Sequence, residues 1–275
     1  MSAPTIRLND GKAIPQIGFG TSPLNDRDVA PAVMSAIEAG YRHIDTAYRY
    51  NNERGVGQGI RESSIPREDL FVTTKLDGPF QGDDRAMGGL EESLRRLGME
   101  YVDLLLIHWP LPQRDQYVST WKTFEKLVAS GKTRSIGLSN FKPAHIERLL
   151  AETSVRPAVN QIQLNPRITR PEQRAYDTEQ GIVTEAWSPL GAGNDLLQEP
   201  ALVTIAEKYG KTPAQVVLRW HMELGVVAIP RSGNPRRIAE NIDIFDFELS
   251  EQEMDTISGL DRGETVVADS DVVGH

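Results

Sequence analysis

The 275-residue sequence contains no cysteine, which excludes disulfides, thiolate nucleophiles and cysteine-ligated metal sites. Histidine is also scarce, at five residues, and no His-Glu-x-x-His or similar spacing is present, so the sequence predicts no metal site. No apolar run approaches the roughly 18 residues that a membrane span needs. Residues 1–7 lack the apolar core of a secretory signal. We therefore expect a cytoplasmic protein with no membrane partner.

Positive charge is in deficit as well. The chain has 30 Lys and Arg residues against 39 Asp and Glu residues, a formal net charge of −9. This balance argues against nucleic-acid binding, which needs a basic surface. Nothing in the composition marks an oligomer interface, so we expect a monomer whose partner is a small molecule.

Short apolar segments alternate with longer amphipathic segments along the whole chain. Strands are predicted at residues 16–20, 43–45, 70–74, 103–107, 135–138, 158–161, 183–186 and 226–229. Helices are predicted at residues 28–39, 85–97, 117–129 and 212–224. Eight such units without a linker favour one α/β domain over 1–275, a (β/α)₈ TIM barrel, with an open doubly wound sheet as the alternative. Residues 9–12 predict the turn of an N-terminal β-hairpin at the barrel bottom.

The common phosphate-binding and hydrolase motifs are incomplete. Gly55, Gly57 and Gly59 resemble a dinucleotide fingerprint, but Ile60 stands where its last glycine belongs and no strand precedes it. Two Gly-Lys-Thr triplets, at 131–133 and 210–212, lack the upstream glycine of a P-loop. No Gly-x-Ser-x-Gly elbow occurs, so a serine hydrolase is not predicted.

Polar and aromatic residues instead follow strand after strand. In an α/β barrel the carboxyl ends of the strands form the active-site face. The residues at those ends are Asp45, Lys75, His108, Trp109, Ser139, Asn140, Gln161, Trp187, Ser188, Arg231 and Ser232. Taken singly, each has a structural explanation: Asp45 as a helix cap, Lys75 as a surface lysine, His108 as a core histidine. Together with nearby tyrosines they indicate one catalytic rim.

These residue types suit the reduction of a carbonyl group, which needs a hydride at carbon and a proton at oxygen. A tyrosine with a pKa of about 10 is a usable acid, and a neighbouring lysine lowers that pKa. An aspartate paired to the lysine keeps the lysine charged and in position. A histidine orients the substrate oxygen, and a cofactor supplies the hydride.

The sequence resembles the aldo-keto reductase family at several motifs. The segments that match are 40–57, 103–110, 136–141, 157–162 and 229–241, and the similarity extends over about residues 5–262. Among its branches the chain looks most similar to the bacterial 2,5-diketo-D-gluconate reductases. The resemblance implies a TIM-barrel oxidoreductase that reduces aldehydes and ketones, such as small dicarbonyls or keto sugars, with NADPH.

The resemblance also implies a role for each matching residue. Tyr50, five residues after Asp45, would be the general acid, with Asp45, Lys75 and His108 completing a catalytic tetrad; Tyr50, His108 and Trp109 would contact substrate. The residues that would contact the cofactor are Gly20, Thr21, Asp45, Ser139, Asn140, Gln161, Trp187, Ser188, Leu190, Arg231, Ser232, Arg237, Glu240 and Asn241. Ser139, Asn140 and Gln161 would hold the nicotinamide amide, and Trp187 would stack on its ring.

A basic cluster near residue 235 supports the phosphate end of that site independently. Arg231, Arg236 and Arg237 stand close together in an otherwise acidic chain, beside a helix start at Pro235. Guanidinium groups bind phosphate in a bidentate manner, and helix N-termini favour anions. The family usually has lysine where Arg231 stands, so NADH stays a possible second cofactor. A solvated basic turn is the structural alternative.

Two other functions remain open at this point. The same motifs would serve a non-catalytic NADPH sensor or an alcohol dehydrogenase that works in the oxidative direction. The acidic surroundings favour neutral aldehydes, ketones and dicarbonyls over carboxylated sugars as substrates.

Overall fold

A closed ring of parallel strands forms the centre of the protein. The computed structural model describes residues 3–193, 195–264 and 267–275. The parallel strands are β3 (Phe19–Gly20), β4 (His43–Asp45), β5 (Phe71–Leu76), β6 (Val102–Ile107), β7 (Thr133–Ser139), β8 (Val159–Gln163), β9 (Val183–Trp187) and β10 (Val227–Ile229), paired in sequence order. Gly18 N donates to Ala228 O at 2.9 Å, and Ala228 N donates to Gln16 O at 3.0 Å, which joins the first strand region to the last. The predicted (β/α)₈ barrel is therefore confirmed, and the alternative of an open doubly wound sheet is wrong.

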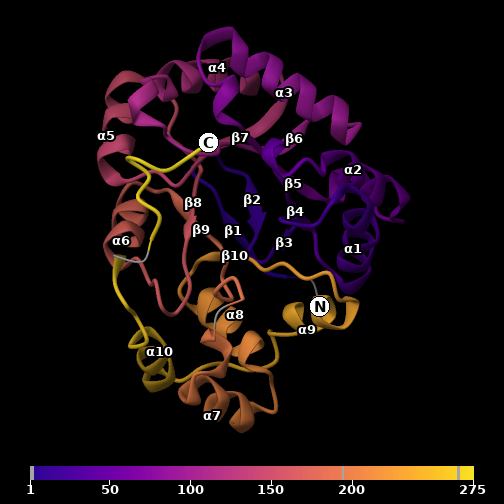
Figure 1. Cartoon of the computed structure of the whole chain (residues 1–275), viewed down its shortest axis with the longest axis vertical. Helices are drawn as coiled ribbons and strands as arrows, with labels where there is room; N and C mark the ends of the chain where they lie inside the picture. Colours follow the sequence, from indigo (N-terminus) through magenta and orange to yellow (C-terminus); the bar gives the residue numbers. More distant parts are fainter. Residues whose placement is uncertain (1–2, 194, 265–266) are drawn as a thin grey trace.

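Helices surround this barrel (Figure 1). They are α1 (Asp26–Ala39), α2 (Glu53–Glu62), α3 (Asp83–Leu97), α4 (Tyr117–Ala129), α5 (Pro143–Glu152), α6 (Pro171–Glu179), α7 (Pro200–Tyr209), α8 (Pro213–Glu223), α9 (Pro235–Ile242) and α10 (Glu251–Ser258). Helices α5 to α9 each begin with proline, whose fixed φ and missing N–H suit the first helical position. Helix α8 is capped by Thr212, whose hydroxyl accepts from Gln215 N at 3.3 Å. No helix among the described residues is long and apolar enough to cross a membrane.

The predicted N-terminal hairpin is present and fills the bottom of the barrel. Strands β1 (Thr5–Arg7) and β2 (Ala13–Pro15) pair antiparallel, and Gly11 adopts φ +86° in the turn between them. Leu8 and Ile14 are buried in one cluster with barrel residues that include Leu104 and Val159. The hairpin therefore closes the end of the barrel at which the strands begin.

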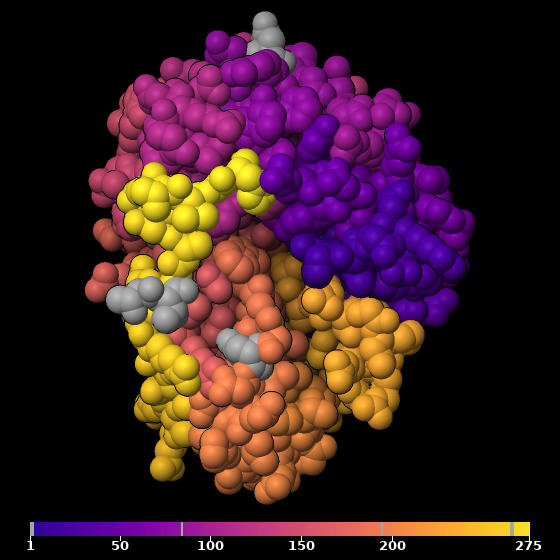
Figure 2. All heavy atoms as spheres, in the orientation of Figure 1, coloured from indigo at the N-terminus to yellow at the C-terminus, as the bar shows by residue number. Residues whose placement is uncertain are grey.

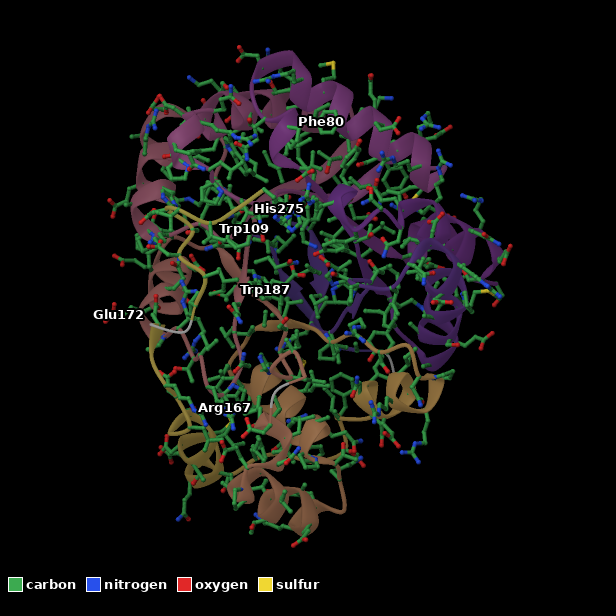
Figure 3. All side chains as sticks on the ribbon, in the orientation of Figure 1. Phe80, Trp109, Arg167, Glu172, Trp187 and His275 are labelled. Atoms are coloured by element: carbon green, nitrogen blue, oxygen red, sulfur yellow. The ribbon has the colours of Figure 1, made fainter. Side chains whose placement is uncertain are left out.

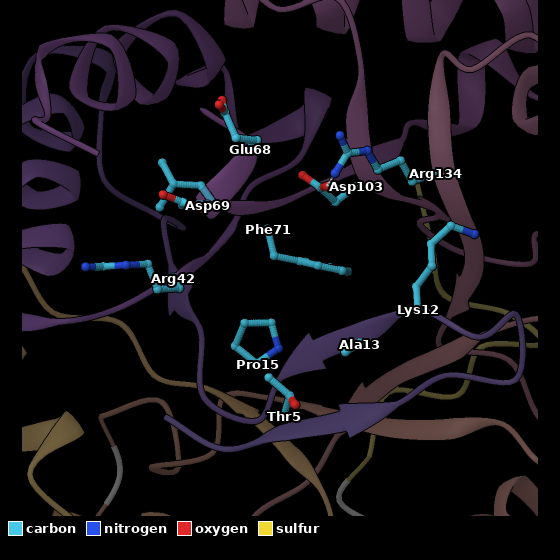
Figure 4. Close-up of a pocket in the computed structure, with 11 residues that line it drawn as sticks. Thr5, Lys12, Ala13, Pro15, Arg42, Glu68, Asp69, Phe71, Asp103 and Arg134 are labelled. Atoms are coloured by element: carbon cyan, nitrogen blue, oxygen red, sulfur yellow. Dashed lines mark hydrogen bonds and ion pairs between the residues drawn. The ribbon is translucent and has the colours of Figure 1, made fainter. Parts of the chain in front are cut away.

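A pocket of about 290 Å³ lies beside this hairpin (Figure 4). Of its charged groups, Asp103 is paired with Arg134 at 3.2 Å, and it also lies 2.7 Å from Arg67, which is outside the lining. Phe71 and Asp103 stand at or near the start of their strands, so this pocket is at the opposite end from the polar residues at the strand ends.

The glycines of α2 allow close helix packing. A Cβ on Gly57 would lie 1.9 Å from Leu97 O at the end of α3, and a Cβ on Gly55 would lie 2.2 Å from Asp26 O on α1. These glycines match the family motif and resemble a phosphate loop in sequence, but they pack α2 between its two neighbours.

Two of the predicted strands end before the strands in the structure do. Lys75 and Gln161 lie within β5 and β8, whereas the sequence predicts that these strands end at residues 74 and 161. Both side chains are fully or almost fully buried. The strand therefore continues through a polar residue, because the barrel interior there is lined by polar partners.

Candidate active site

A buried ion pair lies at the carboxyl end of the barrel. Lys75 Nζ on β5 lies 2.6 Å from Asp45 Oδ1 on β4, and it also donates to Thr46 O at 3.0 Å. Burial lowers the pKa of Lys75, but the charges of Asp45 and Tyr50 outweigh that effect, so its pKa is raised. The lysine therefore stays charged inside the barrel.

Tyr50 is the tyrosine that this lysine contacts. It ends the short helix η1 (Tyr48–Tyr50), and Lys75 Nζ donates to its hydroxyl oxygen at 3.3 Å. Tyr48 packs elsewhere, with its ring 4.8 Å from Phe80 and 3.9 Å from the guanidinium of Arg96. Tyr50, and not Tyr48, thus shares a site with Lys75.

The pKa of Tyr50 departs from the sequence-based expectation. Burial raises it, and the opposing charge of Lys75 offsets this only partly, so the net shift is upward. We expected lysine to lower this pKa because the sequence does not reveal how deeply the phenol is buried. A raised pKa keeps the phenol protonated at neutral pH, as a proton donor requires.

His108 faces the tyrosine from the loop after β6. The two rings lie 5.7 Å apart in an edge-on arrangement. Burial, and then the charge of Lys75, hold the pKa of His108 well below its usual range, so the imidazole is neutral. A neutral imidazole can donate a hydrogen bond to a carbonyl oxygen without adding charge.

Glu185 on β9 also belongs to this site, although it was not among the residues predicted from the sequence. Gln161 Nε2 donates to Asp45 Oδ2 at 2.8 Å and to Glu185 Oε1 at 2.9 Å. Burial raises the pKa of Glu185 to about 8. An isolated glutamate within an otherwise uncharged strand was the signal that could have identified it.

Three of the expected nicotinamide-site residues form one hydrogen-bonded group. Trp187 Nε1 donates to Asn140 Oδ1 at 2.9 Å, and Asn140 Nδ2 donates to Ser139 Oγ at 3.0 Å. Thr21 Oγ1 is buried near Asp45 and has no partner among the described residues. An amide-bearing ring fits this set, because it offers both a polar group for these side chains and a flat face for Trp187.

The expected phosphate-site residues lie around the start of α9. Asn234 Oδ1 accepts from the backbone N–H groups of Arg236 and Arg237 at 3.0 Å and 3.3 Å, which caps the helix. Among the described residues, Arg231 and Arg237 form no ion pair, whereas Arg236 lies 3.3 Å from Glu240. Two guanidinium groups beside a helix N-terminus match the chemistry of a phosphate.

The remaining expected contacts flank these two groups. Ser188 and Leu190 follow β9, with Ser188 in a left-handed conformation at φ 50°. Gly20 ends β3, where a Cβ would lie 2.9 Å from Ile229 Cγ2. Ser232 Oγ accepts from Asn234 N at 3.0 Å, and Asn241 is buried on α9.

The C-terminal segment covers part of this face. Lys142 Nζ lies 2.5 Å from carboxylate oxygens of both Asp269 and Asp271. His275 then lies with its ring 4.7 Å from that of His108 and 6.0 Å from that of Trp109. Figure 2 shows this yellow segment beside a hollow in the surface, and Figure 3 shows His275 and Trp109 close together near the middle of the molecule.

Comparison with known proteins agrees with this geometry. A sequence profile described as "Aldo/keto reductase family" matches residues 16–262. An aldo-keto reductase of Mycolicibacterium smegmatis is 49% identical over 267 residues, 97% of each chain. Methylglyoxal reductase DkgA of Salmonella typhimurium is 44% identical over 276 residues, 100% of each chain. The crystal structure of a Bombyx mori aldo-keto reductase in complex with NADP is 39% identical, with a TM-score of 0.89 over 95% of this chain and 94% of that one. This chain therefore belongs to the aldo/keto reductase family and is an oxidoreductase that acts on carbonyl groups.

Proposed function

We propose that this enzyme reduces small aldehydes, ketones and dicarbonyls to alcohols with NADPH, and that Tyr50 is the proton donor. One observation carries the proposal: the Tyr50 hydroxyl accepts from buried Lys75 Nζ at 3.3 Å, next to the ring of neutral His108. A phenol, a fixed ammonium and a neutral imidazole together can protonate and orient one carbonyl oxygen.

Each side chain has a defined task in this reaction. The substrate carbonyl oxygen accepts hydrogen bonds from the Tyr50 hydroxyl and the His108 imidazole. NADPH, when bound, supplies the hydride to the carbonyl carbon. As negative charge develops on the oxygen, Tyr50 gives up its proton, and Lys75 stabilises the phenolate that results. Asp45 balances the lysine charge throughout.

The cofactor proposal rests on two groups of side chains. Asn140, Ser139 and Gln161 would contact the nicotinamide amide, and Trp187 would stack on its ring. At the other end, Arg231 and Arg237 are free of ion pairs among the described residues and would contact the 2′-phosphate that distinguishes NADPH from NADH. This charge pattern supports NADPH as the preferred cofactor.

The substrate proposal rests on Trp109. Its indole N–H is buried and has no partner among the described residues. A buried donor without a partner costs free energy, so an oxygen of a bound ligand would be favoured there. A dicarbonyl has a second oxygen to place near Trp109 while the first meets Tyr50. The name of the Salmonella relative, a methylglyoxal reductase, agrees with this substrate class.

The test is a steady-state assay that follows NADPH consumption with methylglyoxal, phenylglyoxal and 2,5-diketo-D-gluconate. We expect turnover, with kcat/KM higher for the neutral dicarbonyls. Higher kcat/KM for the diketo-gluconate would overturn the substrate class alone. Tight NADPH binding without turnover of any carbonyl would overturn the reaction and leave a nucleotide sensor.

A further inference from the structure

Three potential metal ligands meet at the mouth of the active site. Asp77 follows β5 and begins the short helix η3 (Gly78–Phe80), His108 follows β6, and His275 lies in the C-terminal segment. One ligand atom from each of the three lies within 4.8 Å of the other two. The backbone holds the cluster together, because Gly78 N donates to His275 O at 3.2 Å.

Both imidazoles in this cluster have a nitrogen with no partner. His108 Nδ1 and His275 Nε2 are buried atoms that make no hydrogen bond with any described residue. Imidazole nitrogens that have no hydrogen-bond partner are available to bind a metal ion.

We propose that Asp77, His108 and His275 form a binding site for a divalent transition-metal ion, best matched to Zn²⁺. Two imidazole nitrogens and one carboxylate oxygen are ligands that Zn²⁺ accepts, whereas Mg²⁺ and Ca²⁺ prefer oxygen alone. Three protein ligands leave the fourth tetrahedral position for water.

Small movements complete the site. Tetrahedral Zn²⁺ with bonds of about 2.0–2.1 Å separates its ligand atoms by about 3.3 Å, so these three must approach by roughly 1.5 Å at most. His275 is half-buried, so part of its side chain borders solvent. The positive charge of Arg49 opposes a metal cation at this site, because its guanidinium lies 3.7 Å from Asp77. The Arg49 side chain is 55% exposed and can move into solvent.

Metal binding here would inhibit the enzyme, a consequence that rests on the proposed function of His108. An imidazole held by Zn²⁺ is not free to orient the substrate oxygen. The ion would also link the C-terminal segment to the loops after β5 and β6, which narrows the entrance. Zn²⁺ should therefore compete with the carbonyl substrate.

The first experiment measures binding without any turnover. Chelator-treated protein is titrated with ZnCl₂ by calorimetry, and with CoCl₂ by visible absorption, which reports a four-coordinate site. We expect one ion per chain, with His275→Gln and Asp77→Asn each weakening affinity by about ten-fold or more. His145→Gln is the matched control, since His145 also contacts the C-terminal segment, 2.8 Å from Asp271, but lies outside the cluster.

The outcomes separate this inference from the proposed function. Unchanged Zn²⁺ affinity in His275→Gln, equal weakening in His145→Gln, or no saturable binding would overturn the site. If Zn²⁺ binds but leaves kcat/KM for methylglyoxal unchanged, the prediction that Zn²⁺ inhibits the enzyme is wrong. We expect saturating Zn²⁺ to lower kcat/KM of the parent protein by about ten-fold or more and to affect His275→Gln far less. Failure of the proposed function would appear instead as absent turnover in metal-free protein.

Discussion

Lys75 Nζ lies 2.6 Å from Asp45 Oδ1, and both side chains are buried inside the barrel. Water cannot solvate either charge there, so each depends on the other. This dependence makes the pair a structural element as well as part of the candidate catalytic site.

Replacing one partner should therefore destabilise the protein. We expect Lys75→Met to lower the free energy of unfolding by about 3–5 kcal/mol, because Asp45 is left buried and unpaired. Urea unfolding measures the difference. Lys208→Met, which removes the exposed partner of Glu253, should change stability little. Similar losses in the two variants would show that burial does not govern the Lys75 pair.

Tyr50→Phe tests the proton donor directly. The variant keeps the ring and loses the hydroxyl, so we expect kcat to fall by about 10²–10⁴-fold while the Kd for NADPH stays close to that of the parent. Tyr48→Phe is the matched control on the same short helix, and it should keep its activity because its ring packs on Phe80 and Arg96. Full activity in Tyr50→Phe would remove this residue from the mechanism.

Glu185 should make stability depend on pH. Its pKa is raised to about 8 in the folded protein, above the value of an exposed carboxyl. Between those two pKa values the folded state keeps a proton that the unfolded chain has released, so stability falls as pH rises, by up to about 1.4 kcal/mol per pH unit. Glu185→Gln should flatten this fall in unfolding experiments from about pH 5 to about pH 8.

A control variant isolates the effect of the buried position. Glu172→Gln removes one acid from the exposed side of α6. This variant should show the same dependence of stability on pH as the parent protein. Parallel stability profiles for the parent and Glu185→Gln would contradict the raised pKa.

The arginines at α9 should determine cofactor choice. Arg231→Ala and Arg237→Ala should each weaken NADPH binding by roughly ten-fold or more, since each loses a charged hydrogen bond to phosphate, and leave NADH binding nearly unchanged. Quenching of tryptophan fluorescence on titration measures both affinities. Arg236→Ala is the control, because Arg236 is paired with Glu240. Equal losses for NADPH and NADH would place the 2′-phosphate elsewhere.

Gly57 should tolerate no side chain. Its Cβ would lie 1.9 Å from the backbone oxygen of Leu97, so Gly57→Ala forces α2 away from α3 and should cost at least about 1–3 kcal/mol of stability. Gly88 on α3 has open space around its Cβ position, and Gly88→Ala should stabilise by about 0.5–1 kcal/mol. Thermal unfolding of the two variants gives the comparison, and shifts of the same sign would contradict it.

Much of the fold could be predicted from the sequence, because local patterns carry it. Alternating apolar strands and amphipathic helices indicated the barrel, and the turn at 9–12 indicated the hairpin. Strand ends were less accurate at Lys75 and Gln161, since a buried polar residue inside a strand looks like a strand end in a sequence. Glu185 was placed inside a predicted strand but not assigned to the site, because the sequence does not show which face of the strand its side chain occupies or that Gln161 lies beside it.

The sequence by itself determined the barrel, through its alternating segments, and the family, through its motifs. It also identified the candidates Asp45, Tyr50, Lys75 and His108 at or after the strand ends. The tertiary structure decided what depends on burial and on distance through space. It set the direction of the Tyr50 pKa shift, because desolvation outweighs the charge of Lys75. It also brought His275 to His108 across 167 positions of the chain, a contact that no spacing rule could reveal, because only packing of the C-terminal segment against the barrel creates it.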